Sequence, residues 1–346
     1  TWVVAIALFA MVGTACGDGG EAGGTDDGGT DTTDGQAEGE VTLRFSCSCV
    51  PEDHHTKAIY KFEEEVEAST NGAIQVEVFD SGSLFDQTAE QTALLRGDLE
   101  MAYASSQWVS ERVPAASIVG VPYMITDLDH LYAVMDGEVG TAIFDAAIEQ
   151  AGIRPLTSLY LGTRHLNLRD IGRQVMVPAD LEGVKLRVPD SESWIKMGTA
   201  LGANPTPVAF GELYLALETG TVDGQDNPLP TTQNAKFYEV TSQISLTGHL
   251  VNDVWPTINE EVWQGLSAEH QQAIADAWQV ARDFGTEIAT TAEAELVTFF
   301  EAEGLEVYEP DRDAFRQHVL DQYLADETLT SQWMEGHLDT IRGLAG

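Results

Sequence analysis

The segment FGELYLALETGTVDGQDNP, residues 210–228, passes from a helical apolar pattern to a row of polar side chains. A helix over 211–219 is predicted by an apolar stripe made of Leu213, Leu215, Ala216 and Leu217. Gly220 and Gly224 then permit tight backbone turns at low steric cost. We therefore expect the chain to turn sharply here and to bring the polar row to one place.

The polar row Gln-Asp-Asn-Pro that ends this segment gathers amide and carboxylate side chains. The amide of Asn227 both donates and accepts hydrogen bonds, which suits a polar ligand. Asp223 and Asp226 are expected to form the turn, because the family resemblance given below implies an anionic ligand, which a bare carboxylate would repel. Pro228 should stiffen the exit.

Around this segment, strands and helices alternate along the chain. VTLRFSC at 41–47 and IQVEVF at 74–79 predict strands, and apolar residues at helical spacing predict a helix between them. LEMAYA, IRPLTSLYL and VKLRV continue the rhythm, which is typical of an α/β protein. From 267 to about 304 the pattern predicts one long helix or two abutting ones, roughly 50 Å in length. Such a helix would brace two lobes.

The charge of the chain excludes one class of partner. The 346 residues carry 57 acidic and 17 basic side chains, for a net charge of −40. Binding to nucleic acid depends on basic surface that neutralises phosphates, so a general nucleic-acid binder is excluded. The same excess of acid argues against docking on anionic lipid.

The N-terminal residues predict export. Residues 2–12 are almost wholly apolar, too few to span a bilayer but typical of a secretory signal. Gly-Thr-Ala-Cys at 13–16 predicts a lipoprotein signal peptide over 1–16, with Cys16 as the lipid attachment site. An ordinary signal peptide that contains a cysteine is the alternative. Residues 17–40 hold mainly Gly, Thr and acidic residues and predict a disordered tether.

Cys47 and Cys49 leave three alternatives open. Outside the cytoplasm they could form a disulfide, although the i, i+2 spacing closes a very small ring, and two free thiols are equally compatible with it. A metal site with His54 or His55 is the weakest alternative, because no second ligand pair has zinc-like spacing. We predict neither a metal nor a cofactor.

Basic residues gather in one window of this acidic chain, formed by Arg164, Arg169, Arg173, Lys185 and Arg187. In the strand-like VKLRV, alternation places Lys185 and Arg187 opposite the apolar residues, so Arg187 can point into a cleft. A guanidinium suits a carboxylate because two parallel N–H groups match two oxygens. Alternatively, these side chains only balance acidic neighbours on the surface.

Several ungapped blocks between 180 and 240 carry a family resemblance. DLEGVKLRVPDSESW, GANPTPVAFGELYLAL, TGTVDGQDNPL and NAKFYEV occur in that order. From about residue 42 to past 310, the chain resembles the solute-binding subunits of tripartite ATP-independent periplasmic (TRAP) transporters, the DctP family. The sialic acid-type and C4-dicarboxylate receptors are the members it resembles.

The resemblance implies a two-lobed periplasmic-binding-protein fold with crossing strands and a long spine helix. Lobe I would hold 41–161 plus 253–292, and lobe II 162–252 plus 293–346. Arg187 would bind the ligand carboxylate, Arg164 would be the second arginine, and Phe210 and Asn227 would line the cleft.

In the first lobe, the two positions that carry acids in sialic acid receptors correspond to Gln87 and Ser105, which are neutral. The resemblance thus implies a smaller organic acid: a C4-dicarboxylate, a 2-oxo or hydroxy acid, or a sugar acid. Trp108 offers a flat apolar face nearby. The alternative is that Gln87 and Ser105 read sialic acid through water.

The implied partners are a small DctQ-type and a large DctM-type membrane subunit, with uptake driven by an ion gradient. The implied location is periplasmic or otherwise extracytoplasmic. A sensory receptor of the same fold is a second hypothesis. An enzyme is disfavoured, because the sequence has no G-x-S-x-G elbow, H-E-x-x-H motif, phosphate loop or dinucleotide fingerprint.

Overall fold

The computed structural model describes residues 41–345. The predicted signal peptide, the lipid attachment at Cys16 and the tether over 17–40 all lie outside the described residues. Among the helices of the described part, none is both long enough and apolar enough to cross a membrane.

Ten strands in the described part join one sheet in the order β2-β1-β3-β9-β5-β8-β6-β7, with β4 and β10 also paired to β9. The strands are β1 (Val41–Ser46), β2 (Ile74–Phe79), β3 (Met101–Ala104), β4 (Ile153–Pro155), β5 (Leu159–Leu168), β6 (Lys185–Val188), β7 (Asn204–Pro207), β8 (Gly224–Pro228), β9 (Gln243–Asn259) and β10 (Glu306–Tyr308).

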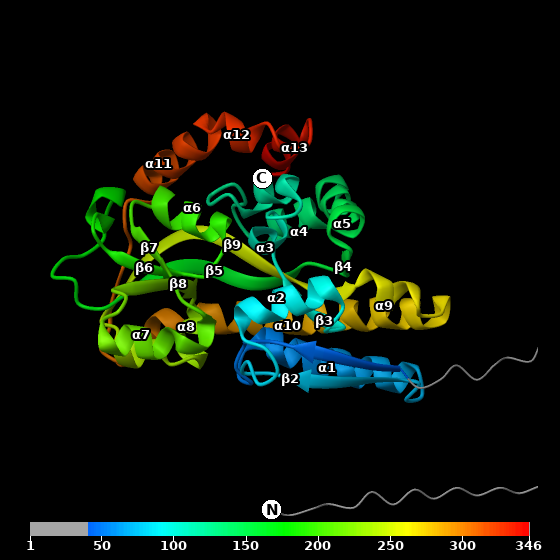
Figure 1. Cartoon of the computed structure of the whole chain (residues 1–346). Helices are drawn as coiled ribbons and strands as arrows, with labels where there is room; N and C mark the ends of the chain where they lie inside the picture. The colour runs from blue at the N-terminus through cyan, green and yellow to red at the C-terminus, as the bar shows by residue number, and fades with distance from the viewer. Residues whose placement is uncertain (1–40, 346) are drawn as a thin grey trace, which may run out of the picture. The chain divides into compact units, whose positions relative to one another are not determined.

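Helices surround this sheet, as expected for an α/β protein (Figure 1). The α-helices are α1 (His54–Ser69), α2 (Gln87–Arg96), α3 (Ser106–Val109), α4 (Leu128–Met135), α5 (Glu138–Ala151), α6 (Glu192–Ala200), α7 (Leu213–Thr219), α8 (Leu229–Asn234), α9 (Glu260–Gln264), α10 (Ala268–Ala302), α11 (Arg312–Ala325), α12 (Glu327–Thr330) and α13 (His337–Leu344). Short 3₁₀ turns are η1 (Pro114–Gly120), η2 (Pro178–Leu181), η3 (Phe210–Glu212) and η4 (Phe237–Val240).

Two long antiparallel strands run through the centre of the sheet. The last residues of β9 pair with β3 and β4, whereas its first residues pair with β10. Along its length β9 also pairs with β5, which in turn pairs with β8. Because β5 and β9 belong to both halves of the sheet, they are the predicted crossing strands.

Helix α10 is one continuous helix. This confirms the prediction of one long helix, and not two abutting ones, in this region. Ser267 caps it by accepting a hydrogen bond from the backbone N–H of His270. At 1.5 Å per residue, its 35 residues extend for roughly 50 Å. It packs against α1 at one end and against α8 and β10 at the other, with β5 between them. Figure 1 shows it running beneath the sheet as the predicted spine.

The segment 210–228 differs from its prediction in two ways. Leu215 is 60% exposed, so the apolar stripe of the short helix α7 is narrower than expected. The helix does end at a left-handed Gly220, with φ of 76°. The predicted polar turn, however, is the buried strand β8. A Cβ on Gly224 would lie 2.3 Å from Leu168 Cδ2, so this glycine allows β8 to approach β5 closely and does not form a turn.

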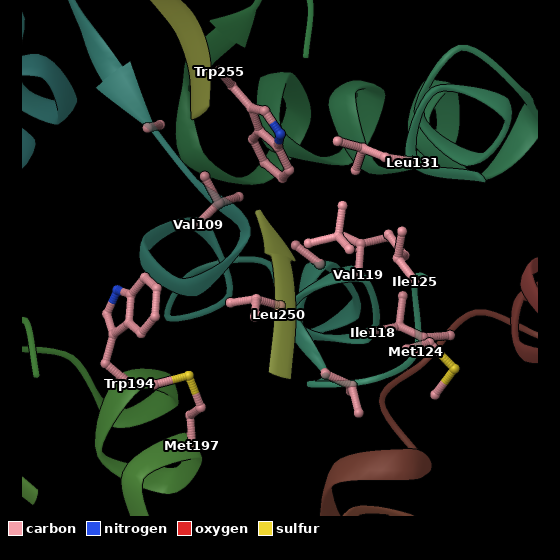
Figure 2. Packing of buried hydrophobic residues seen from close by; sticks show 14 of the residues in the cluster. Val109, Ile118, Val119, Met124, Ile125, Leu131, Trp194, Met197, Leu250 and Trp255 are labelled. Atoms are coloured by element: carbon pink, nitrogen blue, oxygen red, sulfur yellow. The ribbon is translucent and has the colours of Figure 1, made fainter. Parts of the chain in front are cut away.

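One apolar cluster draws side chains from both predicted lobes. Figure 2 shows Val109 from α3, Trp194 from α6 and Leu250 from β9 among its members. Further cluster members come from α4, α5 and α11. The cleft described next is therefore framed by elements that are packed on a common core.

Candidate ligand-binding cleft

Three polar side chains lie on three neighbouring strands. Arg164 is on β5, Asn227 on β8 and Arg187 on β6, and β8 lies between the other two. The register pairs Arg164 with Pro228 and Arg187 with Gln225. Adjacent strands lie about 4.8 Å apart, so residues distant in sequence gather on one part of the sheet.

Arg164 is buried and held from several sides. Its Nε donates to Asn252 Oδ1 at 2.8 Å, and its Nη1 donates to the carbonyl oxygen of Asp226 at 2.6 Å and to Asn227 Oδ1 at 3.2 Å. The guanidinium carbon lies 4.4 Å from the ring centre of Trp194, a cation–π contact. Within the described residues these bonds leave Nη2 without a protein partner.

Arg187 is only 1% exposed and bonds to neutral oxygens. Its Nε donates to Val208 O at 2.8 Å, and its Nη2 donates to Gln87 Oε1 at 2.9 Å. Its guanidinium carbon lies 5.9 Å from the ring centre of Phe210. Burial lowers the pKa of Arg187 to about 9, and the nearby positive charge of Arg164 also lowers it.

Asp226 is not a turn residue, contrary to the sequence-based expectation. It is fully buried in β8, and its Oδ2 lies 3.3 Å from Arg164 Nη1 and 3.2 Å from His249 Nε2. Its negative charge also raises the pKa of Arg187, against the larger effect of burial. The reasoning that a carboxylate would repel an anionic ligand failed, because this carboxylate is the counter-ion that allows two arginines to be buried together.

The opposite wall of the cleft is formed by residues at the ends of β1 and β3 and at the start of α2. β1 is parallel to β3, so the residues that follow both strands meet at one edge of the sheet. Ser105 follows β3, and the loop 47–49 follows β1. Asp86 caps α2 by accepting hydrogen bonds from Thr88 N and Ala89 N, and thereby places Gln87 at the helix start.

Gln87 connects the two walls. Its Oε1 accepts hydrogen bonds from Arg187 Nη2 at 2.9 Å and from the backbone N–H of Phe210 at 3.2 Å. Gln87, which was predicted to contact the ligand, is therefore a hydrogen-bond partner of the Arg187 guanidinium in this structure.

Buried acids line this wall as well. Burial raises the pKa of Glu90 well above its usual value and raises the pKa of Asp53 to about 7. Burial disfavours the charged form of His55 as well, which for a histidine means a pKa well below its usual value, and its ring is neutral. The wall opposite the arginines is thus polar but carries little charge.

A cavity of about 90 Å³ lies between these walls. Arg164, Asn227, Phe210, Gln87 and Ser105 all line it, and Arg187 lies directly behind Gln87 and Phe210. The structure thus brings together every residue predicted for the ligand site. Trp108 lines the cavity too.

Sequence reasoning missed several cavity residues. Trp194 and Asn252 hold Arg164, and Glu90 and Thr231 line the cavity. A buried acid inside an amphipathic helix was a usable signal for Glu90, but the other three residues gave none. The remaining basic residues of the predicted cluster lie elsewhere: Lys185 and Arg173 are exposed and Arg169 is half-buried.

Five buried polar atoms of residues that line the cavity have no hydrogen-bond partner in the described structure. They are His55 Nδ1, Glu90 Oε2, Ser105 Oγ, Trp194 Nε1 and Thr231 Oγ1. An unpaired buried polar atom costs about 1–3 kcal/mol, so such atoms gathered around one cavity indicate a place for a polar ligand or ordered water.

Solved structures have the same fold. A TRAP periplasmic solute-binding protein from Roseobacter denitrificans, with bound 3-deoxy-D-manno-oct-2-ulosonic acid, is 42% identical with a TM-score of 0.84; the match covers 88% of this chain and 100% of that one. A second protein from Roseobacter denitrificans, with bound L-galactonate, is 31% identical with a TM-score of 0.81, and the match covers 90% of this chain and 100% of that one. These similarities confirm the two-lobed α/β fold.

Among characterised relatives, the sialic acid-binding periplasmic protein SiaP of Vibrio cholerae is 37% identical over 195 residues. That match covers 56% of this chain and 60% of SiaP, so it spans less than two thirds of that relative. The family of bacterial extracellular solute-binding proteins, family 7, matches residues 45–327. The chain therefore belongs to this family, the DctP family of extracytoplasmic solute-binding proteins.

Proposed function

We propose that this chain captures a sugar acid or a related hydroxy acid outside the cytoplasmic membrane and delivers it to a TRAP transporter. The observation that carries this proposal is the burial of Arg164 and Arg187 beside one cavity with Asp226 as their shared counter-ion. One carboxylate that is paired with Arg164 and acts on Arg187 through space leaves one positive charge to be balanced. A ligand carboxylate would balance it.

The arrangement favours a carboxylate over a neutral ligand for an electrostatic reason. Burial lowers the pKa of both arginines, which means that the protein interior disfavours their charged forms. An anion in the cavity reverses this cost, and its attraction grows as water leaves the site. Within residues 41–345, Arg164 Nη2 and Arg187 Nη1 make no hydrogen bond to protein, so each guanidinium has a terminal nitrogen that can donate to a carboxylate oxygen.

The opposite wall narrows the ligand class. A C4-dicarboxylate held at Arg164 would bring its second negative charge towards Glu90 and Ser105, and no Lys or Arg among the described residues lines the cavity on that wall. Hydroxyl groups, in contrast, can both donate to and accept from the unpartnered atoms of Glu90, Ser105 and Thr231. Of the organic acids considered from the sequence, polyhydroxylated monocarboxylates therefore fit best.

The ligands of similar solved structures support this narrowing. The two Roseobacter denitrificans proteins hold 3-deoxy-D-manno-oct-2-ulosonic acid and L-galactonate, and a 27% identical protein from Polaromonas holds D-erythronate. Each of these ligands joins one carboxylate to a hydroxylated chain.

Delivery would involve no chemical step. We propose that small DctQ-type and large DctM-type membrane subunits receive the ligand and that an ion gradient drives its uptake. Lipid attachment at Cys16, followed by the tether 17–40, would keep the protein at the outer face of the cytoplasmic membrane. Mass spectrometry of the mature protein tests the anchor directly, because a lipidated chain begins at a diacylated Cys16.

A thermal-shift screen of the full chain tests the ligand class. The probes are 3-deoxy-D-manno-oct-2-ulosonic acid, L-galactonate, D-erythronate, sialic acid and succinate. A ligand at 100 times its dissociation constant stabilises the folded state by about 2.7 kcal/mol, which a melting curve resolves. We expect at least one of the smaller hydroxylated acids to stabilise the protein more than sialic acid or succinate does.

Two results would count against this proposal. Stabilisation by succinate alone would reject the hydroxylated class while keeping the carboxylate site. Nanomolar binding of sialic acid, which the smaller acids fail to displace in direct competition, would reject the prediction that the ligand is smaller than sialic acid.

A further inference from the structure

Two cysteines and a histidine form a cluster in the wall of the cavity. Cys47 and Cys49 lie in the loop after β1, and His55 lies in the first turn of α1. All three side chains are buried, all three line the cavity, and their ligand atoms lie within 4.8 Å of one another. The cluster is therefore preassembled by the fold.

The backbone holds the two cysteines in place. Gly82 N donates to Cys47 O at 3.0 Å and Ser81 N donates to Cys49 O at 2.8 Å. The two Cα atoms are 5.2 Å apart, and the sulfurs are joined as a disulfide in this structure. These bonds fix the backbone of the loop beside the cavity, independently of the S–S bond.

The donor set matches a thiophilic cation. Two thiolates and one imidazole are typical zinc ligands, and a three-ligand site leaves the fourth tetrahedral position open. Two sulfurs on one zinc ion lie about 3.8 Å apart, since each Zn–S bond is about 2.3 Å. The observed cluster is close enough to reach this geometry by side-chain rotation once the S–S bond is broken.

Two further features point to a ligand at His55. Its Nδ1 is buried and has no hydrogen-bond partner. On the other side of the ring, Nε2 lies 3.8 Å from Asp53 Oδ2. This separation is longer than a hydrogen bond, and a small movement that shortened it would give the carboxylate–imidazole pair that orients histidine ligands in metal sites.

We propose that the dithiol form of this chain binds one thiophilic divalent cation through Cys47, Cys49 and His55. The disulfide and the metal-bound form exclude each other, because the cation binds thiolates and the disulfide contains none. Reduction breaks the S–S bond with two electrons and two protons, and metal binding then releases the two thiol protons. This proposal does not depend on which organic acid, if any, the cavity takes.

Zinc titration of the untagged full chain tests the proposal. A water-soluble phosphine reduces the disulfide, becomes the phosphine oxide by taking oxygen from water, and is removed under anaerobic conditions. We expect reduced protein to bind one zinc ion per chain on the order of 100-fold more tightly than oxidised protein does. Cobalt(II) in place of zinc should add thiolate-to-metal charge-transfer absorption.

Variants assign the ligands. Cys47→Ser with Cys49→Ser should lose the tight site, and His55→Ala should weaken it and alter the cobalt spectrum. Cys16→Ser is the matched control, because it removes the remaining cysteine and should leave affinity unchanged. Circular dichroism verifies that each variant is folded. Oxidised wild-type protein is a further control, because its disulfide removes the two thiolates without any mutation.

Three results would overturn the proposal. They are equal zinc affinity of reduced and oxidised protein, loss of binding in Cys16→Ser, and an unchanged affinity and cobalt spectrum in His55→Ala.

Discussion

Arg187 forms hydrogen bonds within the protein and is also proposed to bind the ligand carboxylate. It bonds to Val208 O and Gln87 Oε1, neither of which carries a charge. Asp226 is shared with Arg164, to which it is directly paired. A ligand carboxylate would be a charged partner for a cation that now has neutral ones, which makes Arg187 the most informative position to change.

Arg187→Ala should weaken binding of the best ligand from the screen by about 2–5 kcal/mol, because the ligand anion is left buried without its partner. Arg187→Lys should also weaken binding strongly, since an ammonium cannot replace the planar fork. Isothermal titration calorimetry measures both. Lys185→Ala is the matched control: Lys185 is exposed on the same strand and its loss should leave affinity unchanged. Wild-type affinity in Arg187→Ala would reject the assignment.

The pKa of Arg187 predicts a pH dependence of binding. In the ligand-free cleft, burial lowers this pKa to about 9. A bound carboxylate favours the charged form and raises the pKa, so the affinity gained from this pair is fully present below pH 9 and falls as pH rises above 9. Calorimetry between pH 7 and about pH 10, in buffers of different ionisation heat, should show proton uptake on binding only in the upper part of this range. Constant affinity across the range would contradict it.

At the scale of secondary structure, β8 determines whether the site exists. It is the strand between β5 and β6, and it carries both Asp226 and Asn227. Its close contact with β5 depends on Gly224, where a Cβ would meet Leu168 Cδ2 at 2.3 Å and Asn167 O at 3.0 Å. The backbone oxygen cannot rotate away, so a side chain here must displace the strand.

Gly224→Ala should therefore destabilise the protein by about 1–3 kcal/mol and should weaken ligand binding as well. Gly211→Ala is the control from the same segment, because nothing lies within 4 Å of the position that its added methyl group would take. Its effect should stay within about 0.5 kcal/mol. Guanidinium unfolding measures both free energies, and equal stability of the two variants would show that the strand accommodates the methyl group.

At the scale of the whole molecule, polar contacts join the two predicted lobes around the cavity. Ser110 Oγ lies 2.7 Å from Ser193 Oγ, and Gln87 bonds to Arg187. Polar contacts of this kind are typical of surfaces that separate and rejoin, whereas the apolar cluster shared by both predicted lobes opposes their full separation. We propose that 41–161 with 253–292 move relative to 162–252 with 293–346 when ligand enters or leaves.

Small-angle X-ray scattering tests this motion. The radius of gyration should decrease on addition of saturating ligand, because ligand contacts from both lobes favour the closed state over the open one. Arg187→Ala at the same ligand concentration should show no decrease. An unchanged radius in wild-type protein, with binding verified by calorimetry, would mean that the lobes do not move as a clamp.

Local sequence pattern determined the elements. The alternation in 74–79 produced β2 at those bounds, and the apolar spacing of Ala58, Ile59, Phe62 and Val66 produced the buried face of α1. Ser267 began α10 where a capping residue was expected. These features depend on neighbours within a few residues, so a single sequence contains the information needed to predict them.

Tertiary structure alone decided what the cleft contains. Asp226 was predicted to be a turn residue because a bare carboxylate would repel an anionic ligand, yet strand pairing with β5 buries it beside Arg164. In the same way, Trp194 and Asn252 reach Arg164 only because α6 and β9 pack next to β5. The sequence by itself determined which arginines are available and where most strands and helices form, with β8 as the exception. Which groups balance their charge depends on contacts between residues far apart in the chain, and those contacts exist only once the sheet has assembled.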